Sequence, residues 1–196
     1  MRKFLKNFAN LAGFQFRKRD GVLFVIGMAL PLILLFLVFL RLRHSGGLIH
    51  GDYLSLLLSG KRKLIYYFAV GFLEEFLFRG LLVGLLCRKI KNLSLNMLLS
   101  AAIFAIPHAI NANIPILVLL LFSFAFGILA CEMRCFSKSI WMSTAFHWTW
   151  NYTIVSVFMT TNTNQFIYAW ITAEIVALAM VFYLLMKKEK KPLSIW

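Results

Sequence analysis

The chain has 196 residues, of which 61% are hydrophobic, and twenty of them are phenylalanine. Its mean hydropathy of +0.81 and its long apolar runs exclude an ordinary soluble domain and indicate a polytopic membrane protein. The formal charge is +14, but the basic residues lie at the ends of the apolar runs, where anionic lipid headgroups attract them. We therefore expect an all-α membrane helix bundle that contacts anionic lipid and binds no nucleic acid.

The first 20 residues form a basic segment with a hydrophobic stripe. Apolar residues recur there at the spacing of one helix face, with lysine and arginine between them: Phe4, Leu5, Phe8, Leu11 and Ala12. This pattern is typical of an amphipathic helix lying in the membrane interface. The apolar run that follows has no Ala-x-Ala-type cleavage site, so we expect a retained membrane span rather than a signal peptide.

About six apolar segments follow, which is the number that a chain of this length accommodates. They are predicted at residues 21–40, 64–86, 94–112, 115–131, 139–159 and 166–186. No internal repeat or linker divides them, so we interpret residues 1–196 as a single membrane domain.

Basic residues at both ends of the chain predict that both termini are cytoplasmic, which an even number of spans allows. The loop at residues 41–63 conflicts with this topology, because it would be external and yet contains five basic residues. A short, lysine-rich, multi-pass chain favours a bacterial plasma membrane.

Three ionisable residues, Glu74, Glu75 and Arg79, interrupt the second apolar segment. A charged side chain at bilayer depth costs about 2.5–3.5 kcal/mol, so these side chains should face protein or water and mark a functional site. Glu75 and Arg79 have the i, i+4 spacing of a helical ion pair, while Glu74 lies about 100° away around the helix axis. The spacing therefore predicts one paired glutamate and one that points elsewhere.

Two further apolar segments carry histidine in similar pairs. Phe104 and His108 are four residues apart, as are His147 and Asn151, so each pair lies on one helix face. At about 1.5 Å per residue, Glu74 and His108 lie at similar depths in the membrane, which permits a shared site. Each residue also has a structural alternative, because histidine and asparagine commonly hydrogen-bond between membrane helices.

Together, Glu74-Glu75-x-x-x-Arg79, Phe104-x-x-x-His108 and His147-x-x-x-Asn151 resemble the motifs of the CPBP group of intramembrane proteases. This group includes the CAAX prenyl endopeptidases and the bacterial Abi proteins linked to bacteriocin processing and self-immunity. The resemblance covers residues 64–159, the predicted catalytic core. It implies an intramembrane endopeptidase that hydrolyses a peptide bond in a peptide or membrane-protein substrate, and a prenylated substrate does not follow from it.

The resemblance also implies roles for individual residues. Glu74 and His108 would hold and activate a water molecule, and His147 with Asn151 would form the oxyanion hole. Such roles suit a carboxylate base and N–H donors.

The remaining motif residues would support the site. Glu75 and Arg79 are the implied orienting pair, and Phe104 is a packing residue. Which of Glu74 and Glu75 is the base stays open at this point.

A metal ion is the second open question. If zinc takes part, Glu74, His108 and His147 are the candidate ligands. The chain contains no His-Glu-x-x-His motif, and Asn151 is a poor zinc ligand. We therefore favour a metal-free mechanism in which glutamate activates water.

Two other classes of protein remain as alternatives. The same fold can serve as a non-proteolytic membrane protein for binding, immunity or scaffolding. A small transporter that uses Glu74 and Glu174 as proton carriers is a weaker alternative. It predicts dependence on Glu174 and indifference to Asn151.

Overall fold

The computed structural model describes residues 12–44, 61–109, 115–154 and 165–188. The predicted interfacial stripe, apart from Ala12, lies outside the described residues, as do most of the 41–63 loop and the turns around residues 112 and 160. Ala12 itself is buried, and its backbone lies against Gly80.

All regular structure in the described residues is helical, so the predicted all-α membrane bundle is confirmed. The order is α2 (Lys18–His44), α4 (Lys61–Glu75), the π-helix η1 (Phe76–Leu82), α5 (Val83–Lys89), α6 (Leu93–His108), α7 (Ile116–Ser137), α8 (Trp141–Thr153) and α9 (Gln165–Lys188).

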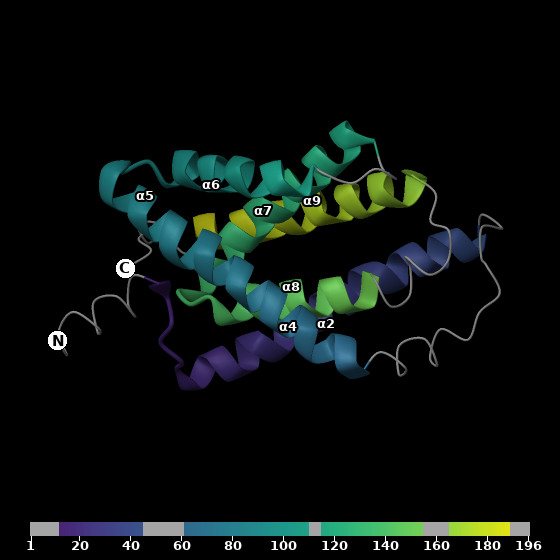
Figure 1. Ribbon diagram of the computed structural model, residues 1–196, viewed down its shortest axis with the longest axis horizontal. Coiled ribbons are helices and arrows are strands. Elements are labelled where there is room, and N and C mark those ends of the chain that lie inside the picture. The colour runs from purple at the N-terminus through teal and green to yellow at the C-terminus, as the bar shows by residue number, and fades with distance from the viewer. Residues whose placement is uncertain (1–11, 45–60, 110–114, 155–164, 189–196) are drawn as a thin grey trace.

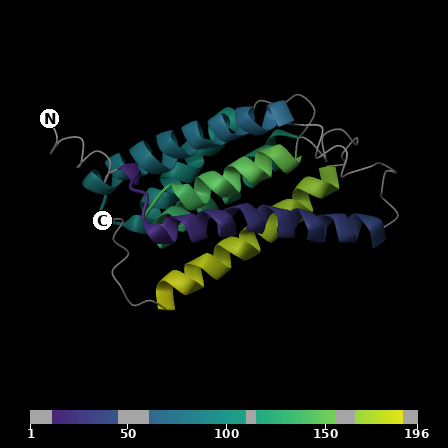
Figure 2. The same cartoon turned by 90° about the horizontal axis from the view of Figure 1, so that it is seen from below.

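The helices form two groups that meet along α7 and α8 (Figure 1). In one group α7 packs against α6 and α9, and in the other α8 packs against α2 and α4. Figure 2 shows α2 crossing α9, which closes the bundle on a second side. The largest hydrophobic core lies between the groups and includes Phe104, Phe126 and Phe146.

Several helix ends follow from local sequence. The side chain of Asn92 accepts a hydrogen bond of 3.1 Å from the backbone N–H of Leu95 and so caps the start of α6. At the end of α7, Lys138 adopts a left-handed conformation with φ 58°, and its N–H donates to the carbonyl oxygen of Arg134. This turn allows the chain to reverse into α8 within a few residues.

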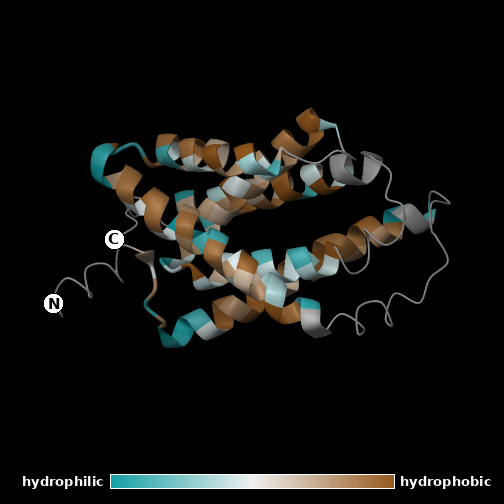
Figure 3. Ribbon diagram, in the orientation of Figure 1, coloured by the Kyte–Doolittle hydropathy of each residue, from teal (hydrophilic) through white to brown (hydrophobic). Residues whose placement is uncertain are grey.

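Three helices in the described part of the chain are long and apolar enough to cross a membrane: Lys18–Arg41, Ile116–Ser137 and Trp170–Lys187. The helix Leu93–His108 is apolar but shorter. Figure 3 shows that hydrophobic residues cover most of the helices, whereas hydrophilic residues gather at the start of α2 and around the α5–α6 turn.

One end of the bundle collects the predicted cytoplasmic residues. The guanidinium of Arg17, at the start of α2, donates a 2.6 Å hydrogen bond to the carbonyl oxygen of Ser137, at the end of α7. A small apolar cluster that includes Val83, Leu93, Cys135 and Met186 joins the ends of α5, α7 and α9 to the start of α6. We call this the basic end, because these helix termini carry Arg17, Arg19, Arg88, Lys89, Lys91, Arg134, Lys138 and Lys187.

The opposite end of the bundle holds an ion pair. Glu174 on α9 is buried and pairs with Arg41 near the end of α2. Arg41 is one of the basic residues that conflict with the predicted topology. The pair gives its charge a structural role.

Two glycines allow helices to approach closely where the motif residues lie. A Cβ atom at Gly71 on α4 would lie 3.1 Å from the backbone nitrogen of Trp148 on α8. A Cβ atom at Gly127 on α7 would lie 2.9 Å from Cα of Ala101 on α6. Both separations are shorter than ordinary contacts, so only glycine permits this spacing.

Candidate active site

Glu75, the last residue of α4, is fully buried between two basic side chains. Its Oε1 atom lies 2.9 Å from Nη1 of Arg79 and 3.0 Å from Nδ1 of His147 on α8. One carboxylate therefore links three elements of the site, α4, η1 and α8.

Glu74 lies on a more open side of α4. Its Oε2 atom is 3.5 Å from Nε2 of His108 on α6 and 3.5 Å from Nε2 of His147. The side chains of Glu74 and His108 are 27% and 34% exposed, whereas that of Glu75 is 0% exposed. The two glutamates thus have different environments, as their angular offset on the helix predicts.

Hydrogen bonding orients both imidazole rings. Nδ1 of His108 lies 2.7 Å from the carbonyl oxygen of Phe104, and a carbonyl oxygen only accepts, so Nδ1 carries the proton. In the same way, Nδ1 of His147 donates to the Glu75 carboxylate. Each ring consequently directs Nε2 toward Glu74.

Arg79 is buried and fixed on three sides. In addition to its ion pair with Glu75, its Nη2 atom donates a 3.4 Å hydrogen bond to the carbonyl oxygen of Gly127. Its guanidinium carbon lies 4.1 Å from the centre of the Phe104 ring, a cation–π contact. The Phe104 ring in turn lies 4.3 Å from the His108 ring. Phe104 therefore lies between Arg79, which pairs with Glu75, and His108, which pairs with Glu74.

The predicted helix over residues 64–86 is interrupted by the π-helix η1, which begins directly after Glu75 and contains Arg79. π-helical turns have i→i+5 hydrogen bonds and occur often at functional sites. Sequence reasoning did not anticipate this segment, because a π-helical turn has no characteristic side-chain pattern.

Ser143 is a second residue that sequence reasoning missed. It is fully buried on α8, one turn before His147, and its hydroxyl donates a 3.1 Å hydrogen bond to the carbonyl oxygen of Ile140. Its i, i+4 spacing from His147 is the signal that places it on the same helix face.

Asn151 lies one turn beyond His147 on α8 and is half-buried. Its position near the cluster follows from this helical spacing. Ion pairs and ring contacts join the other motif residues: Glu74, Glu75, Arg79, Phe104, His108 and His147.

In the described residues, no group of three or more His, Cys, Asp or Glu side chains is placed to hold a metal ion. Glu74, His108 and His147 converge, but they do not form such a group. Cys87, Cys131 and Cys135 are free thiols.

Comparison with known proteins gives one match. Residues 62–153 match the family model described as type II CAAX prenyl endopeptidase Rce1-like. No curated protein and no solved structure matches the chain. The matched region covers a little under half of the chain and contains every motif residue described above. The CPBP resemblance is confirmed at this level, because residues 62–153 are similar to the Rce1-like family of CAAX-type membrane proteases.

Proposed function

We propose that this protein is an intramembrane endopeptidase in which Glu74 and His108 activate a water molecule. The observation that carries the proposal is the convergence of Glu74 Oε2 with Nε2 of His108 and of His147. These atoms come from α4, α6 and α8, which are well separated in the sequence. A water molecule between them would contact a carboxylate oxygen and the imidazole nitrogens at once.

In this mechanism the water attacks the carbonyl carbon of the scissile peptide bond. Glu74 accepts a proton from the water as the new C–O bond forms, and His108 holds the water in place. When the C–N bond breaks, the proton passes from Glu74 to the leaving amine. Glu74 suits this role better than Glu75, because it is partly open while Glu75 is occupied by Arg79 and His147.

The tetrahedral intermediate requires donors for its oxyanion. We assign this role to Nε2 of His147 and to the side-chain amide of Asn151. Glu75 supports the assignment, because its carboxylate at Nδ1 orients the ring. In its protonated form the ring carries N–H groups at both nitrogens and donates from Nε2. Arg79 holds the Glu75 carboxylate in turn.

The proposed substrate is a peptide or a segment of a membrane protein that reaches the site near the bilayer. The family description names CAAX prenyl endopeptidases, so a prenylated peptide belongs in any substrate panel. Bacteriocin self-immunity and peptide processing are the biological roles that the CPBP resemblance suggests.

The proposed location is the bacterial plasma membrane, with both termini in the cytoplasm. The gathering of basic helix termini at one end of the bundle supports this orientation, because such residues are retained on the cytoplasmic side.

The test compares the wild type with Glu74→Gln, His108→Ala and His147→Ala in detergent, with an unprenylated and prenylated peptide library as substrate. Glu174→Gln is the matched control, because it neutralises a buried acid outside the site. We expect the three site variants to lose cleavage by a factor of about 10²–10⁴ or more while remaining folded, and the control to cleave normally.

A chelator arm tests the metal question in the same assay. The metal-free mechanism predicts unchanged cleavage, and inhibition that zinc reverses would overturn it. Folded site variants that cleave like the wild type would overturn the assignment of the site. A cellular phenotype that persists in all three variants would support the non-proteolytic alternative.

A further inference from the structure

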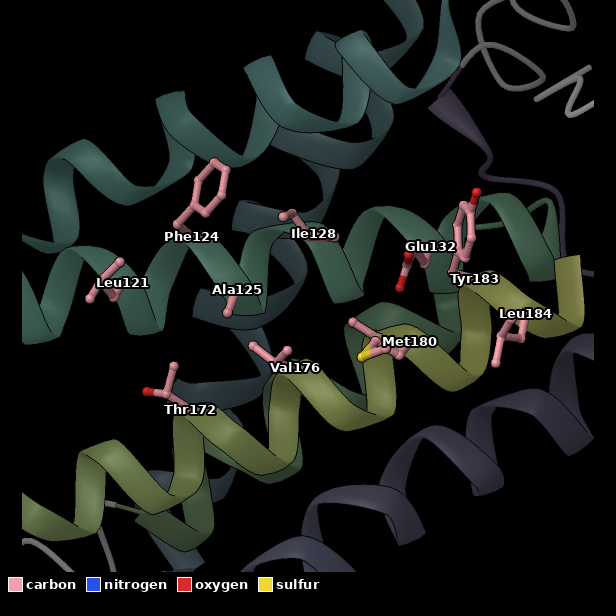
Figure 4. Close-up of a pocket in the computed structure, with 11 residues that line it drawn as sticks. Leu121, Phe124, Ala125, Ile128, Glu132, Thr172, Val176, Met180, Tyr183 and Leu184 are labelled. Carbon is pink, nitrogen blue, oxygen red and sulfur yellow. The ribbon is translucent and has the colours of Figure 1, made fainter. Parts of the chain in front are cut away.

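A groove of about 560 Å³ lies between α7 and α9 (Figure 4). Its walls are almost entirely apolar, and the side chains of Leu121, Val176, Met180 and Leu184 at its rim are all exposed. In a bilayer this rim faces lipid. The volume lies in the range of small-molecule binding sites.

The groove is separate from the candidate active site. α7 contacts the site through Phe126, whose ring lies 4.9 Å from that of His147, and through Gly127. The groove is lined by other positions on α7, including Ala125 and Ile128, and by α9. No motif residue lines it.

One buried carboxyl group lies among these apolar walls. Glu132 is 4% exposed, and Figure 4 shows its carboxylate directed into the space between α7 and α9. Its Oε2 atom has no hydrogen-bond partner in the part of the chain that the structure describes. A buried carboxyl oxygen without a hydrogen-bond partner is costly, so Oε2 is a place where a bound molecule can donate a hydrogen bond.

The two ends of the groove differ, because Glu132 lies near only one of them. Glu132 lies about 7–8 Å from the end of α7 at the basic end, at 1.5 Å per residue. From Glu132 the groove extends along α7 to Leu121, about 16 Å away on the same rule. A bound molecule therefore has room for a polar group at one end and a long apolar chain toward the membrane centre.

We propose that this groove binds a single-chain amphiphile with an ammonium head group, with the head on Glu132 and the chain between α7 and α9. The unpartnered Oε2 atom of Glu132 selects a head group that donates hydrogen bonds, and an ammonium group donates up to three, whereas an ionised carboxylate donates none. The apolar walls select the alkyl chain. The molecule enters sideways from the bilayer, since the rim is open to lipid. This site goes beyond the proposed protease function and does not depend on it.

The experiment uses the full chain in nanodiscs of phosphatidylcholine and three probes with equal chains: tetradecylamine, tetradecanol and tetradecanoic acid. Binding is followed by native mass spectrometry and by the shift in thermal unfolding. We expect the amine to bind the wild type at least about tenfold more tightly than the alcohol or the acid, as a charge-assisted hydrogen bond predicts.

Two variants locate the site. Glu132→Gln should weaken amine binding by about tenfold or more, whereas Glu174→Gln, which neutralises an acid of α9 outside the groove, should bind like the wild type. Met180→Trp fills the groove from an exposed position and should block the amine while leaving Glu132 unchanged. If Glu132→Gln does not fold, two results still test the proposal: the relative affinities of the three probes for the wild type, and amine binding by Met180→Trp.

Equal affinity of the wild type for the amine and the alcohol would overturn the proposal. So would unchanged amine binding in folded Glu132→Gln or in Met180→Trp. Peptide cleavage by the same samples is a separate readout. A failure of the groove proposal is therefore distinguishable from a failure of the proposed protease.

Discussion

Nδ1 of His147 lies 3.0 Å from Oε1 of Glu75, so two residues separated by 72 positions in the chain share a buried hydrogen bond. The same carboxylate oxygen also receives Arg79. Because Glu75 is fully buried and bound to Arg79 and His147, the neighbouring Glu74 is the carboxylate left facing the imidazole Nε2 atoms. Of the two adjacent glutamates, Glu74 is thus partly exposed and faces the histidines, whereas Glu75 is buried and has a structural role.

Neutralising each glutamate in turn should separate these roles. We expect Glu75→Gln to lower the free energy of unfolding by about 3–5 kcal/mol, because it leaves Arg79 buried without its counter-charge. Glu74→Gln should change stability by less than about 1 kcal/mol and still abolish cleavage, because its side chain is partly exposed. Thermal unfolding and peptide cleavage, measured on the same preparations, give both quantities.

The opposite order of stabilities would contradict this division. In particular, a Glu75→Gln protein as stable as the wild type would show that Arg79 does not depend on the carboxylate.

Removing the aromatic ring that joins the ionic groups should reduce activity more than stability. Phe104→Leu retains an apolar side chain but loses the cation–π contact with Arg79 and the ring contact with His108. The cation–π contact contributes about 0.5–2 kcal/mol. We expect a fall in kcat at nearly constant KM. Without the ring, Arg79 and His108 are misplaced, and in the proposed mechanism these residues position the attacking water and do not bind the substrate.

Phe136→Leu is a suitable control, since Phe136 packs against Phe182 at the basic end and away from the site. Equal losses of kcat in the two variants would indicate a general packing effect.

A methyl group at Gly127 should separate α6 from α7. Its Cβ atom would lie 2.9 Å from both Cα and Cβ of Ala101, and the backbone of Gly127 also accepts from Arg79. We expect Gly127→Ala to destabilise the protein by about 1–3 kcal/mol, as for other overpacked cores. Thermal unfolding in detergent measures the effect.

Gly21→Ala is the matched control, because the nearest atom to a Cβ there is Phe16 Cζ at 3.9 Å. An alanine in this helix should be neutral or slightly stabilising. Equal destabilisation of both variants would count against the steric explanation.

Asp20 should hold the basic end together. Its carboxylate accepts from the backbone N–H of Arg17 at 2.7 Å and from the hydroxyl of Ser139 at 2.8 Å, so it joins the start of α2 to the α7–α8 turn. We expect Asp20→Asn to lower the free energy of unfolding by about 1–3 kcal/mol, because the amide cannot accept all of these bonds. The exposed Lys18→Gln in the same turn should change it by less than about 0.5 kcal/mol.

Much of the fold and of the site follows from sequence periodicity. The apolar runs predict the helices, and the i, i+4 spacing places Glu75 with Arg79 and Phe104 with His108. Tertiary contacts account for what the sequence does not reveal. The Gly127 carbonyl at Arg79 and the pairing of Glu174 with Arg41 depend on how helices pack, which one sequence does not encode locally.

The π-helix at Phe76–Leu82 changes how the faces of α4 and α5 are related. Because its hydrogen bonds skip one residue more than those of an α-helix, it rotates α5 relative to the face on which Glu74 and Glu75 lie. Deleting a single residue from this segment would restore a regular helix without removing any motif side chain. Such a deletion would rotate Val83 and Gly84, which are now buried, away from α6. The packing of α5 against α6 therefore requires this number of residues in the π-helix.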